Sequence, residues 1–217
     1  MKCTFEDVRY QDYVIKDGKL IGDFEGLYSV CADPWKQSEH LNESRRILAI
    51  NWCQRLRKLS GSTNIIELGC GYGYLTQSLR DLSFCSVGVD ISRTAVQKAR
   101  ALNPGSVFIE ATISDFDLLE RFDPDVFLME EITWYVLEEL DLFIERLKKY
   151  SAGRSNPTYL IHLLTTYAPG VQKYGTDSFT NLDEILSYFD LDFIEYGIIS
   201  QNAVDPQSKG TYFIARI

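Results

Sequence analysis

The sequence predicts an α/β protein in which one mainly parallel sheet is covered by helices. From about residue 61 onward, short apolar segments of strand length alternate with amphipathic segments of helix length. The first apolar segment runs into a glycine-rich turn at residues 69–73, and the second ends in an acid, Asp90. Ligands of open α/β sheets bind beyond the carboxyl ends of such strands. These observations predict a ligand-binding crevice next to the first two strands.

The glycine-rich turn follows residues 64–68, Asn-Ile-Ile-Glu-Leu, which predict a buried strand, and it precedes a helix expected to begin near Tyr74. Gly69, Gly71 and Gly73 alternate along the turn, and the lack of Cβ atoms lets a ligand approach the backbone. Their spacing is G-x-G-x-G, whereas dinucleotide-binding proteins carry G-x-G-x-x-G. A turn with a purely structural role is the alternative, because a short glycine pattern alone has little specificity.

Asp90 ends the second predicted strand at a distance typical of a ribose-binding carboxylate. It lies 90 − 69 = 21 residues after Gly69, close to the roughly 20 residues found in nucleotide-binding α/β folds. Charged hydrogen bonds from a carboxylate to a ribose diol are strong and directional. The alternative is an N-cap role for Asp90, but Ser92 competes for that position. The glycine turn and Asp90 together predict a cofactor that contains a ribose.

Residues 1–60 do not continue the alternation, and they predict an N-terminal helical cap or lid. A short helix is expected between residues 20 and 30. It should end before Pro34, because a proline excludes the helical conformation for the residue before it. A long amphipathic helix is expected from 38 to 59, with Arg45 and Arg46 among the charged residues of a solvated face. The predicted buried stripe comprises Leu41, Leu48, Trp52, Leu56 and Leu59.

The remaining elements complete a sheet that closes with a hairpin. Ser92 is expected to cap a helix that ends at 103–105. A capping box at 180–183 opens a helix that continues through residue 189. The other predictions are strands at 107–110, 125–129, 159–164, 193–200 and 211–216, helices at 117–121 and 134–150, and a hairpin loop at 202–210.

Composition narrows the class of partner. A chain of 217 residues is long enough for one domain with a full core. Its net charge of −9 disfavours a nucleic-acid substrate, which requires a basic surface. No apolar run approaches the roughly 20 residues of a membrane span, and the first residues are too polar for a signal peptide. The five cysteines are scattered and contain no C-x-x-C pair, so we expect neither a zinc site nor a disulfide framework. We therefore expect a cytoplasmic protein that acts on a small molecule.

Three segments resemble a known family. Residues 67–73, Glu-Leu-Gly-Cys-Gly-Tyr-Gly, resemble motif I of the class I methyltransferases, which bind S-adenosylmethionine (SAM). Asp33-Pro34-Trp35 and residues 131–137, Glu-Ile-Thr-Trp-Tyr-Val-Leu, are similar to the nodulation-protein-S-like (NodS) branch of small-molecule methyltransferases. The resemblance implies a Rossmann-like seven-stranded sheet with an antiparallel last strand. It also implies a SAM-binding domain over residues 61–217 and S-adenosylhomocysteine (SAH) as the product.

The resemblance assigns cofactor contacts to the ends of the first four sheet strands. It implies that the three glycines line the methionine and ribose parts of SAM, with Asp90 on the ribose, Ile91 against the adenine and Glu130 toward the methionine. Glu67 belongs to the same motif.

One position departs from the family. Thr112 stands where the family often has an acid that accepts the adenine amino group. The Thr112 hydroxyl, Asp115 or the backbone amide of Ile113 must then serve.

The cofactor motifs do not identify the group that removes a proton from the methyl acceptor. Methyl transfer from a sulfonium is an in-line displacement that mainly needs alignment, although an alcohol acceptor benefits from a general base. Candidates near the strand ends are Glu131, Tyr135 and His162. Glu131 can instead bind a substrate ammonium or cap a helix. His162 lies in an alternating apolar run and points away from its neighbours, so a buried structural histidine is an equal alternative.

Substrate contacts are expected from the N-terminal segment. Trp35 is a candidate lid over the cofactor or substrate, and the alternative is a core anchor after the proline turn. Arg45 or Arg46 can bind a carboxylate or phosphate. The sequence thus predicts a methyl transfer to N or O of a small polar metabolite, such as an amino sugar or a phosphorylated or carboxylated intermediate.

Two other functions on the same fold remain open, an inactive SAM-binding regulatory subunit and an aminopropyltransferase. No Asp-Asn pair of the catechol-methyltransferase type is present, so no metal is expected. The oligomeric state stays open.

Overall fold

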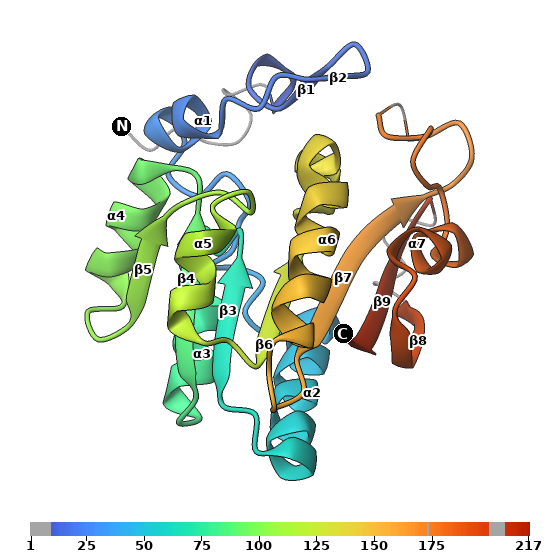
Figure 1. The fold of residues 1–217 in the computed structure, drawn as a ribbon. Helices are drawn as coiled ribbons and strands as arrows, with labels where there is room; N and C mark the ends of the chain where they lie inside the picture. The colour runs from blue at the N-terminus through green and yellow to red at the C-terminus, as the bar shows by residue number, and fades with distance from the viewer. Residues whose placement is uncertain (1–9, 173, 200–206) are drawn as a thin grey trace.

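A seven-stranded sheet forms the centre of the molecule (Figure 1), as the computed structural model shows for residues 10–172, 174–199 and 207–217. The strand order is β5-β4-β3-β6-β7-β9-β8. Strands β3 to β7 are parallel, and β9 is antiparallel to both β7 and β8. The predicted Rossmann-like sheet with an antiparallel last strand is confirmed. The strands are β3 (Asn64–Leu68), β4 (Cys85–Asp90), β5 (Val107–Glu110), β6 (Val126–Glu130), β7 (Tyr159–Tyr167), β8 (Asp192–Ile199) and β9 (Ser208–Arg216).

Helices cover both faces of the sheet. Alternate residues of β3 show why, because Ile65 packs with α2 and α3, whereas Ile66 packs with α5, α6 and α7 on the other face. Each central strand is therefore apolar on both sides, as parallel sheets require. The helices are α2 (Ser44–Ser60), α3 (Tyr74–Asp81), α4 (Arg93–Leu102), α5 (Phe116–Leu119), α6 (Leu137–Ala152) and α7 (Leu182–Phe189), with short 3₁₀ turns η2 (Glu120–Phe122) and η3 (Thr133–Tyr135).

The N-terminal cap lies above the carboxyl ends of the strands (Figure 1). It contains η1 (Tyr10–Asp12), the small hairpin β1 (Ile15–Lys16) and β2 (Lys19–Leu20), and α1 (Phe24–Val30). Helix α2 packs on the sheet instead, where Trp52 and Leu56 are buried beside α3. The segment that covers the strand ends is thus residues 10–43.

Hydrogen bonds of two charged side chains, Glu25 and Lys98, connect α1 to α4. The Glu25 carboxylate accepts hydrogen bonds from Ser92 Oγ (2.7 Å), Thr94 N (3.0 Å) and Thr94 Oγ1 (2.6 Å). In the opposite direction, Lys98 Nζ donates to the backbone oxygen of Tyr28 at 2.9 Å. The cap therefore has a defined position relative to the end of β4.

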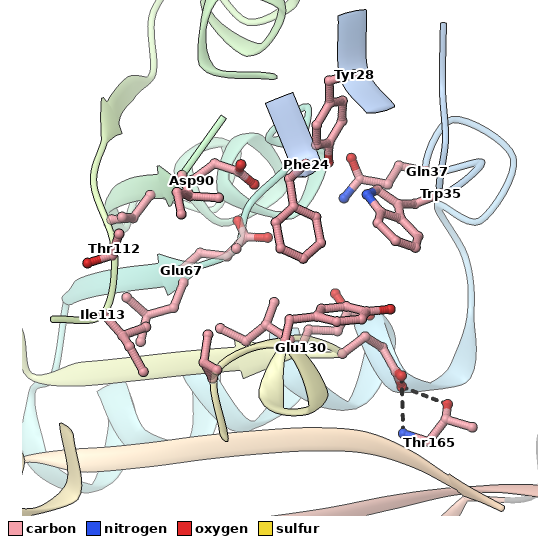
Figure 2. Close-up of a pocket in the computed structure, with 18 of the residues that line it drawn as sticks. Phe24, Tyr28, Trp35, Gln37, Glu67, Asp90, Thr112, Ile113, Glu130 and Thr165 are labelled. Carbon is pink, nitrogen blue, oxygen red and sulfur yellow. Dashed lines mark hydrogen bonds between the residues drawn. The ribbon is translucent and has the colours of Figure 1, made fainter. Parts of the chain in front are cut away.

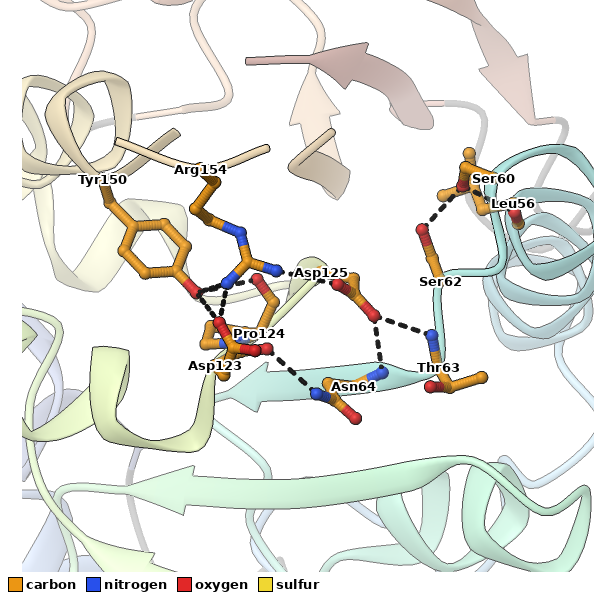
Figure 3. Close-up of polar contacts among 10 residues, drawn as sticks. All are labelled: Leu56, Ser60, Ser62, Thr63, Asn64, Asp123, Pro124, Asp125, Tyr150 and Arg154. Atoms are coloured by element: carbon orange, nitrogen blue, oxygen red, sulfur yellow. Dashed lines mark hydrogen bonds and ion pairs between the residues drawn. The ribbon is translucent and has the colours of Figure 1, made fainter. Parts of the chain in front are cut away.

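A polar cluster joins β3 to β6 at the opposite end of the sheet (Figure 3). Asp125 Oδ2 accepts the backbone amides of Thr63 (2.8 Å) and Asn64 (3.1 Å), and Oδ1 accepts from Arg154 Nη2 at 2.9 Å. Each carboxylate oxygen has a donor, as a buried charge requires.

Several predicted boundaries need correction. The helix expected from residue 20 begins at Phe24, because Leu20 pairs in β2. The helix expected from residue 38 begins at Ser44, since the Asp33 carboxylate accepts the amides of residues 37 and 38 and holds them in a turn. The helix expected at 134–150 is divided into η3 and α6.

Further corrections concern caps and exposure. Asn181, rather than Thr180, is the N-cap of α7, and β9 begins at Ser208. Of the predicted hairpin loop 202–210, residues 202–206 lie outside the described residues. Leu41 and Leu59, expected in the buried stripe, are exposed, and Arg46, expected on the solvated face, is buried.

Candidate active site

A cavity of about 530 Å³ lies between the cap and the carboxyl ends of β3, β4, β5 and β6. Figure 2 shows Asp90, Thr112 and Ile113 at one end and Thr165 at the other, with Phe24 and Trp35 from the cap. The volume falls in the range of sites that enclose a small molecule. The cavity thus occupies the place where an α/β sheet binds its ligand.

The three glycines of the turn have different surroundings. All have positive φ, at +72° for Gly69, +54° for Gly71 and +74° for Gly73, which explains why glycine is favoured at each. Gly69 lines the cavity. A Cβ on Gly71 would lie 2.4 Å from Gln37 Oε1, and one on Gly73 would lie 2.2 Å from the Phe108 ring. Gly73 therefore permits close packing of α3 on the sheet, and Gly71 permits the approach of Gln37.

Asp90 holds the turn and the start of α4 together. Its Oδ2 accepts the amide of Gly71 at 2.8 Å, and its Oδ1 accepts the amide of Ser92 at 2.9 Å. Burial raises the pKa of Asp90 to about 6, and these two amide hydrogen bonds oppose that rise. Asp90 also lines the cavity, so the carboxylate is supported from behind while it remains accessible to a ligand.

Glu67 is a second buried acid beneath the cavity. Its carboxylate accepts a hydrogen bond from Thr76 of α3. Burial raises the pKa of Glu67 to about 8, although the Thr76 hydroxyl lowers it. At pH 7 we therefore expect Glu67 to be mainly protonated and to contribute little charge.

The predicted adenine end is built from the residues after β4 and β5. Ile91, Thr112 and Ile113 all line the cavity. Asp115 Oδ2 accepts from Thr112 N (2.8 Å) and Thr112 Oγ1 (3.1 Å). The Thr112 hydroxyl is thus engaged with Asp115.

Gln37 of the cap reaches into the glycine turn. Its Oε1 accepts the amide of Tyr72 at 2.8 Å, and its Nε2 donates to the Cys70 oxygen at 3.4 Å. Arg46 Nη1 in turn donates to the backbone oxygen of Gln37 at 3.2 Å. The cap is therefore attached to the loop that the cofactor is predicted to contact.

Arg45 forms ion pairs with three carboxylates at the other end of the cavity. Its nitrogens lie 2.6 Å from Glu43 Oε2, 3.0 Å from Glu130 Oε1 and 3.2 Å from Glu131 Oε1. Arg46 Nε lies 3.6 Å from Glu130 Oε2. Burial raises the pKa of Glu130 and of Glu131, and the two arginines oppose this at Glu130. Glu130 Oε1 is buried and makes no hydrogen bond among the described residues, although it faces Arg45.

Glu131 is fixed by its backbone and by β7. Its φ is +60°, which is strained for any residue other than glycine. Strained backbone of this kind is often found at functional sites. Its carboxylate accepts from Thr165 N (3.1 Å) and Thr165 Oγ1 (2.9 Å), contacts that Figure 2 draws as dashed lines. Thr165 and Arg45 together therefore determine where this carboxylate points.

Aromatic rings from the cap meet Tyr135 above the cavity. Ring centroids are 5.8 Å apart for Trp35 and Tyr135, and 5.3 Å apart for Phe24 and Tyr135. The Tyr10 hydroxyl donates to that of Tyr135 at 3.3 Å. Burial raises the pKa of Tyr135 well above its ordinary value, which disfavours it as a base near neutral pH.

His162 lies in the core, outside the cavity lining. As predicted from its alternation, it points away from Ile161 and Leu163, and it stacks on Phe213 at 4.6 Å between ring centroids. Its Nε2 lies 2.7 Å from Thr133 Oγ1, and burial lowers its pKa to about 3. His162 therefore has no contact with a ligand in the cavity.

The structure brings most predicted site residues together. Gly71, Gly73 and His162 are not part of the cavity lining, for the packing reasons given above. Sequence reasoning missed Phe24, Tyr28, Gln37, His40 and Thr165, which line it as well. The predicted residues on the lining are Trp35, Arg45, Arg46, Glu67, Gly69, Asp90, Ile91, Thr112, Ile113, Glu130, Glu131 and Tyr135.

Residues 65–150 match a family model described as a methyltransferase domain. The matched segment runs from β3 into α6 and contains the glycine turn, Asp90 and Glu131. The cavity fits SAM in one specific respect, because Asp90, a buried carboxylate on its lining, can accept hydrogen bonds from ribose hydroxyls. The match and the fold indicate a class I methyltransferase domain that begins at β3.

Solved structures share this fold. The N-methyltransferase NodS from Bradyrhizobium japonicum WM9, in complex with SAH, has a TM-score of 0.59 at 15% identity, over 88% of this chain and 97% of that chain. Magnesium protoporphyrin IX methyltransferase (ChlM) from Synechocystis PCC 6803 with bound SAH has a TM-score of 0.56 at 14% identity, over 83% and 84%. The resemblance to NodS predicted from the sequence is confirmed at the level of the fold.

A third neighbour is much longer than this chain. WbdD, described as a bifunctional kinase-methyltransferase, has a TM-score of 0.62 at 17% identity over 84% of this chain. The present chain spans only 43% of WbdD. A comparison with curated protein sequences gives no match. Among the described residues, no helix is long and apolar enough to cross a membrane, and no cluster of metal-ligand side chains occurs.

Proposed function

We propose that this protein transfers a methyl group from SAM to a nitrogen of a small polar metabolite and releases SAH. The observation that carries the proposal is a single cavity that joins two differently built ends. Gly69 and Asp90 at one end suit the ribose part of the cofactor. Glu131 and Thr165 at the other end border space for an acceptor.

The charge of the cavity favours an amine over an anion. Its lining includes five acids and two arginines, so even with Glu67 protonated the acids outnumber the arginines. Arg45 and Arg46 already contact Glu130, so they are poorly disposed to capture a substrate carboxylate or phosphate. A cationic amine gains from this excess of negative charge. The five acids are Glu67, Asp90, Glu130, Glu131 and Glu139.

Each end has a distinct part in the proposed reaction. Asp90 would accept hydrogen bonds from the ribose hydroxyls, and Ile91 would contact the adenine. Glu130 would face the methionine part. SAM, when bound, supplies a methyl group already activated by the sulfonium charge. The chain's own contribution is then to align the acceptor, which Glu131 and Trp35 would orient, and to exclude water beneath the cap.

Calorimetric titration with SAM, SAH and NADH tests the cofactor site. We expect SAM and SAH to bind and NADH not to bind. Asp90→Asn should raise the Kd for SAH by about 10- to 100-fold, because it weakens charged hydrogen bonds. Glu110→Gln is a matched control, since Glu110 is the register partner of Asp90 on β5, pairs with Arg93 and does not line the cavity. Binding of NADH alone, or equal SAH affinity in both variants, would contradict the assignment.

The acceptor is tested by measuring SAH release with matched amines and alcohols. Turnover with amines and none with alcohols of the same carbon skeleton supports the proposal. Turnover with alcohols alone contradicts a nitrogen acceptor. SAH binding without turnover on either series would instead favour a regulatory subunit.

A further inference from the structure

The cavity contains a histidine that the motifs of the sequence do not point to. The sequence has two histidines, and of these His40 lines the cavity whereas His162 does not. His40 lies in the turn between Trp35 and α2, in the part of the chain that was expected to be helical. The late start of α2 thus decides its position, because residues 38–43 turn beside the cavity before the helix begins.

A carboxylate orients this imidazole. His40 Nδ1 lies 2.6 Å from Glu43 Oε1, and the other oxygen of Glu43 lies 2.6 Å from Arg45 Nη2. Arg45 Nη1 continues the series to Glu131 Oε1 at 3.2 Å. Glu43 is therefore held at both oxygens, which fixes the carboxylate that faces the imidazole. The series also connects His40 to the end of the cavity assigned to the acceptor.

A carboxylate at Nδ1 has a definite chemical effect. It stabilises the tautomer that carries hydrogen on Nδ1, and it leaves the Nε2 lone pair free to accept a proton. It also stabilises the imidazolium that forms afterwards. Histidine in this setting is the commonest general base of enzymes.

We propose that His40, positioned by Glu43, is the general base that removes a proton from the methyl acceptor. The inference rests on the proposed methyl transfer. His40 Nε2 first takes a proton from the bound ammonium, which frees the lone pair of the acceptor nitrogen. That lone pair forms the new bond to the methyl carbon, the S–CH₃ bond breaks, and its electron pair stays on sulfur. The product leaves as a methylated ammonium, and the imidazolium loses its proton to solvent after product release.

Other groups on the cavity are less suited to this task. Glu131 accepts two hydrogen bonds from Thr165 and contacts Arg45, so about three of its four lone pairs are engaged and one is left to orient the acceptor. Glu130 faces both arginines. The raised pKa of Tyr135 keeps that phenol protonated. His40 has one ring nitrogen engaged by Glu43, and the other is left for the acceptor.

Nitrogen NMR of ¹⁵N-histidine-labelled protein in the presence of SAH tests the tautomer without any acceptor. Two imidazoles give simple spectra, and His40→Gln assigns them. Burial lowers the pKa of His162 to about 3, so its signals should stay constant between pH 5 and 9. We expect His40 to be protonated on Nδ1 when neutral, and Glu43→Gln to shift it toward the other tautomer. Protonation on Nε2 in the wild type would overturn the proposal.

Kinetics with an amine acceptor supply the second test. His40→Gln should lower kcat by about 100-fold or more, remove the acid limb of the kcat/KM profile and leave the Kd for SAH within twofold. Added imidazole should restore part of the activity of His40→Ala, which a structural role would not allow. Glu43→Gln should lower kcat less than His40→Gln does, because the imidazole remains and loses only the carboxylate that orients it.

The outcomes separate the two proposals. Unchanged kcat in His40→Gln overturns the general base while methyl transfer stands. Failure of SAM and SAH to bind the wild type overturns the proposed function, and the base proposal falls with it.

Discussion

Lowering the pH from 7 to 5 should destabilise the wild-type fold by about 2 kcal/mol relative to a His162→Gln variant. His162 is a buried residue of β7 that packs against Phe189 of α7, stacks on Phe213 and shares one hydrogen bond with Thr133. Glutamine cannot take up a proton in this range, and its amide can reach the position of Nε2 and keep the contact with Thr133. The variant therefore removes the titration with little other change.

The sign and size follow from the two pKa values. Burial lowers the pKa of His162 from 6.5 to about 3, so the folded state resists a proton that the unfolded chain accepts. Its contribution to stability is complete above pH 6.5 and is lost as the pH falls toward 3. At pH 5 the ratio of protonated to neutral histidine in the unfolded chain is about 30, which corresponds to a free-energy difference of about 2 kcal/mol. Glu67 and Asp90, whose pKa values burial raises to about 8 and 6, act in the opposite direction, and they cancel because both proteins carry them.

Urea unfolding followed by circular dichroism at pH 7, 6 and 5 measures the difference, as the shift in midpoint multiplied by the slope m. The gap between variant and wild type should widen in favour of the variant as the pH falls. A gap that stays constant within about 0.5 kcal/mol would refute the reasoning, because it would mean that folded His162 takes up protons as readily as the unfolded chain does.

Three further substitutions test packing and charge. Gly73→Ala should cost about 2 kcal/mol more than Gly61→Ala, because both glycines have φ near +75° but only at Gly73 would a Cβ strike Phe108; equal melting temperatures would contradict this. Arg45→Met should cost about 2 kcal/mol by removing the cation that Glu130 and Glu131, both partly buried, share, whereas an unchanged urea midpoint would show that they are protonated or solvated. Asp125→Asn should cost about 2 kcal/mol through lost charged hydrogen bonds to β3 and Arg154, and a loss no larger than that of the exposed Asp117→Asn would exclude this role.

Local patterns sufficed for the sheet and for the cofactor end of the cavity. Gly69 and Asp90 are separated by only 21 positions in the sequence (90 − 69 = 21), and adjacent parallel strands must bring the glycine turn and Asp90 together. The alternation of β7 likewise predicted which way His162 points. Such features depend on residues that are close in the sequence or in the adjacent strand, so they can be predicted from one sequence.

The cap was less predictable because its contacts join distant segments. Arg46 reads as a surface residue of an amphipathic helix, yet it is buried since Glu130 lies opposite it, 84 residues later (130 − 46 = 84). The position of Gln37 depends on a turn held by Asp33, which periodicity alone extends into a helix. His40 was missed for the same reason. Pairings of this kind come from tertiary packing, and no local pattern encodes them.

The position of β9 also constrains how the chain is made. β9 is the last of the seven strands in sequence, yet it lies between β7 and β8 (Figure 1). While the polypeptide emerges from the ribosome, β7 and β8 therefore have no partner on their facing edges until β9 follows. Unpaired edges invite pairing with other chains. A chain that ends before residue 208 would lack β9, so β8 would lose its partner in the sheet and β7 would keep an open edge.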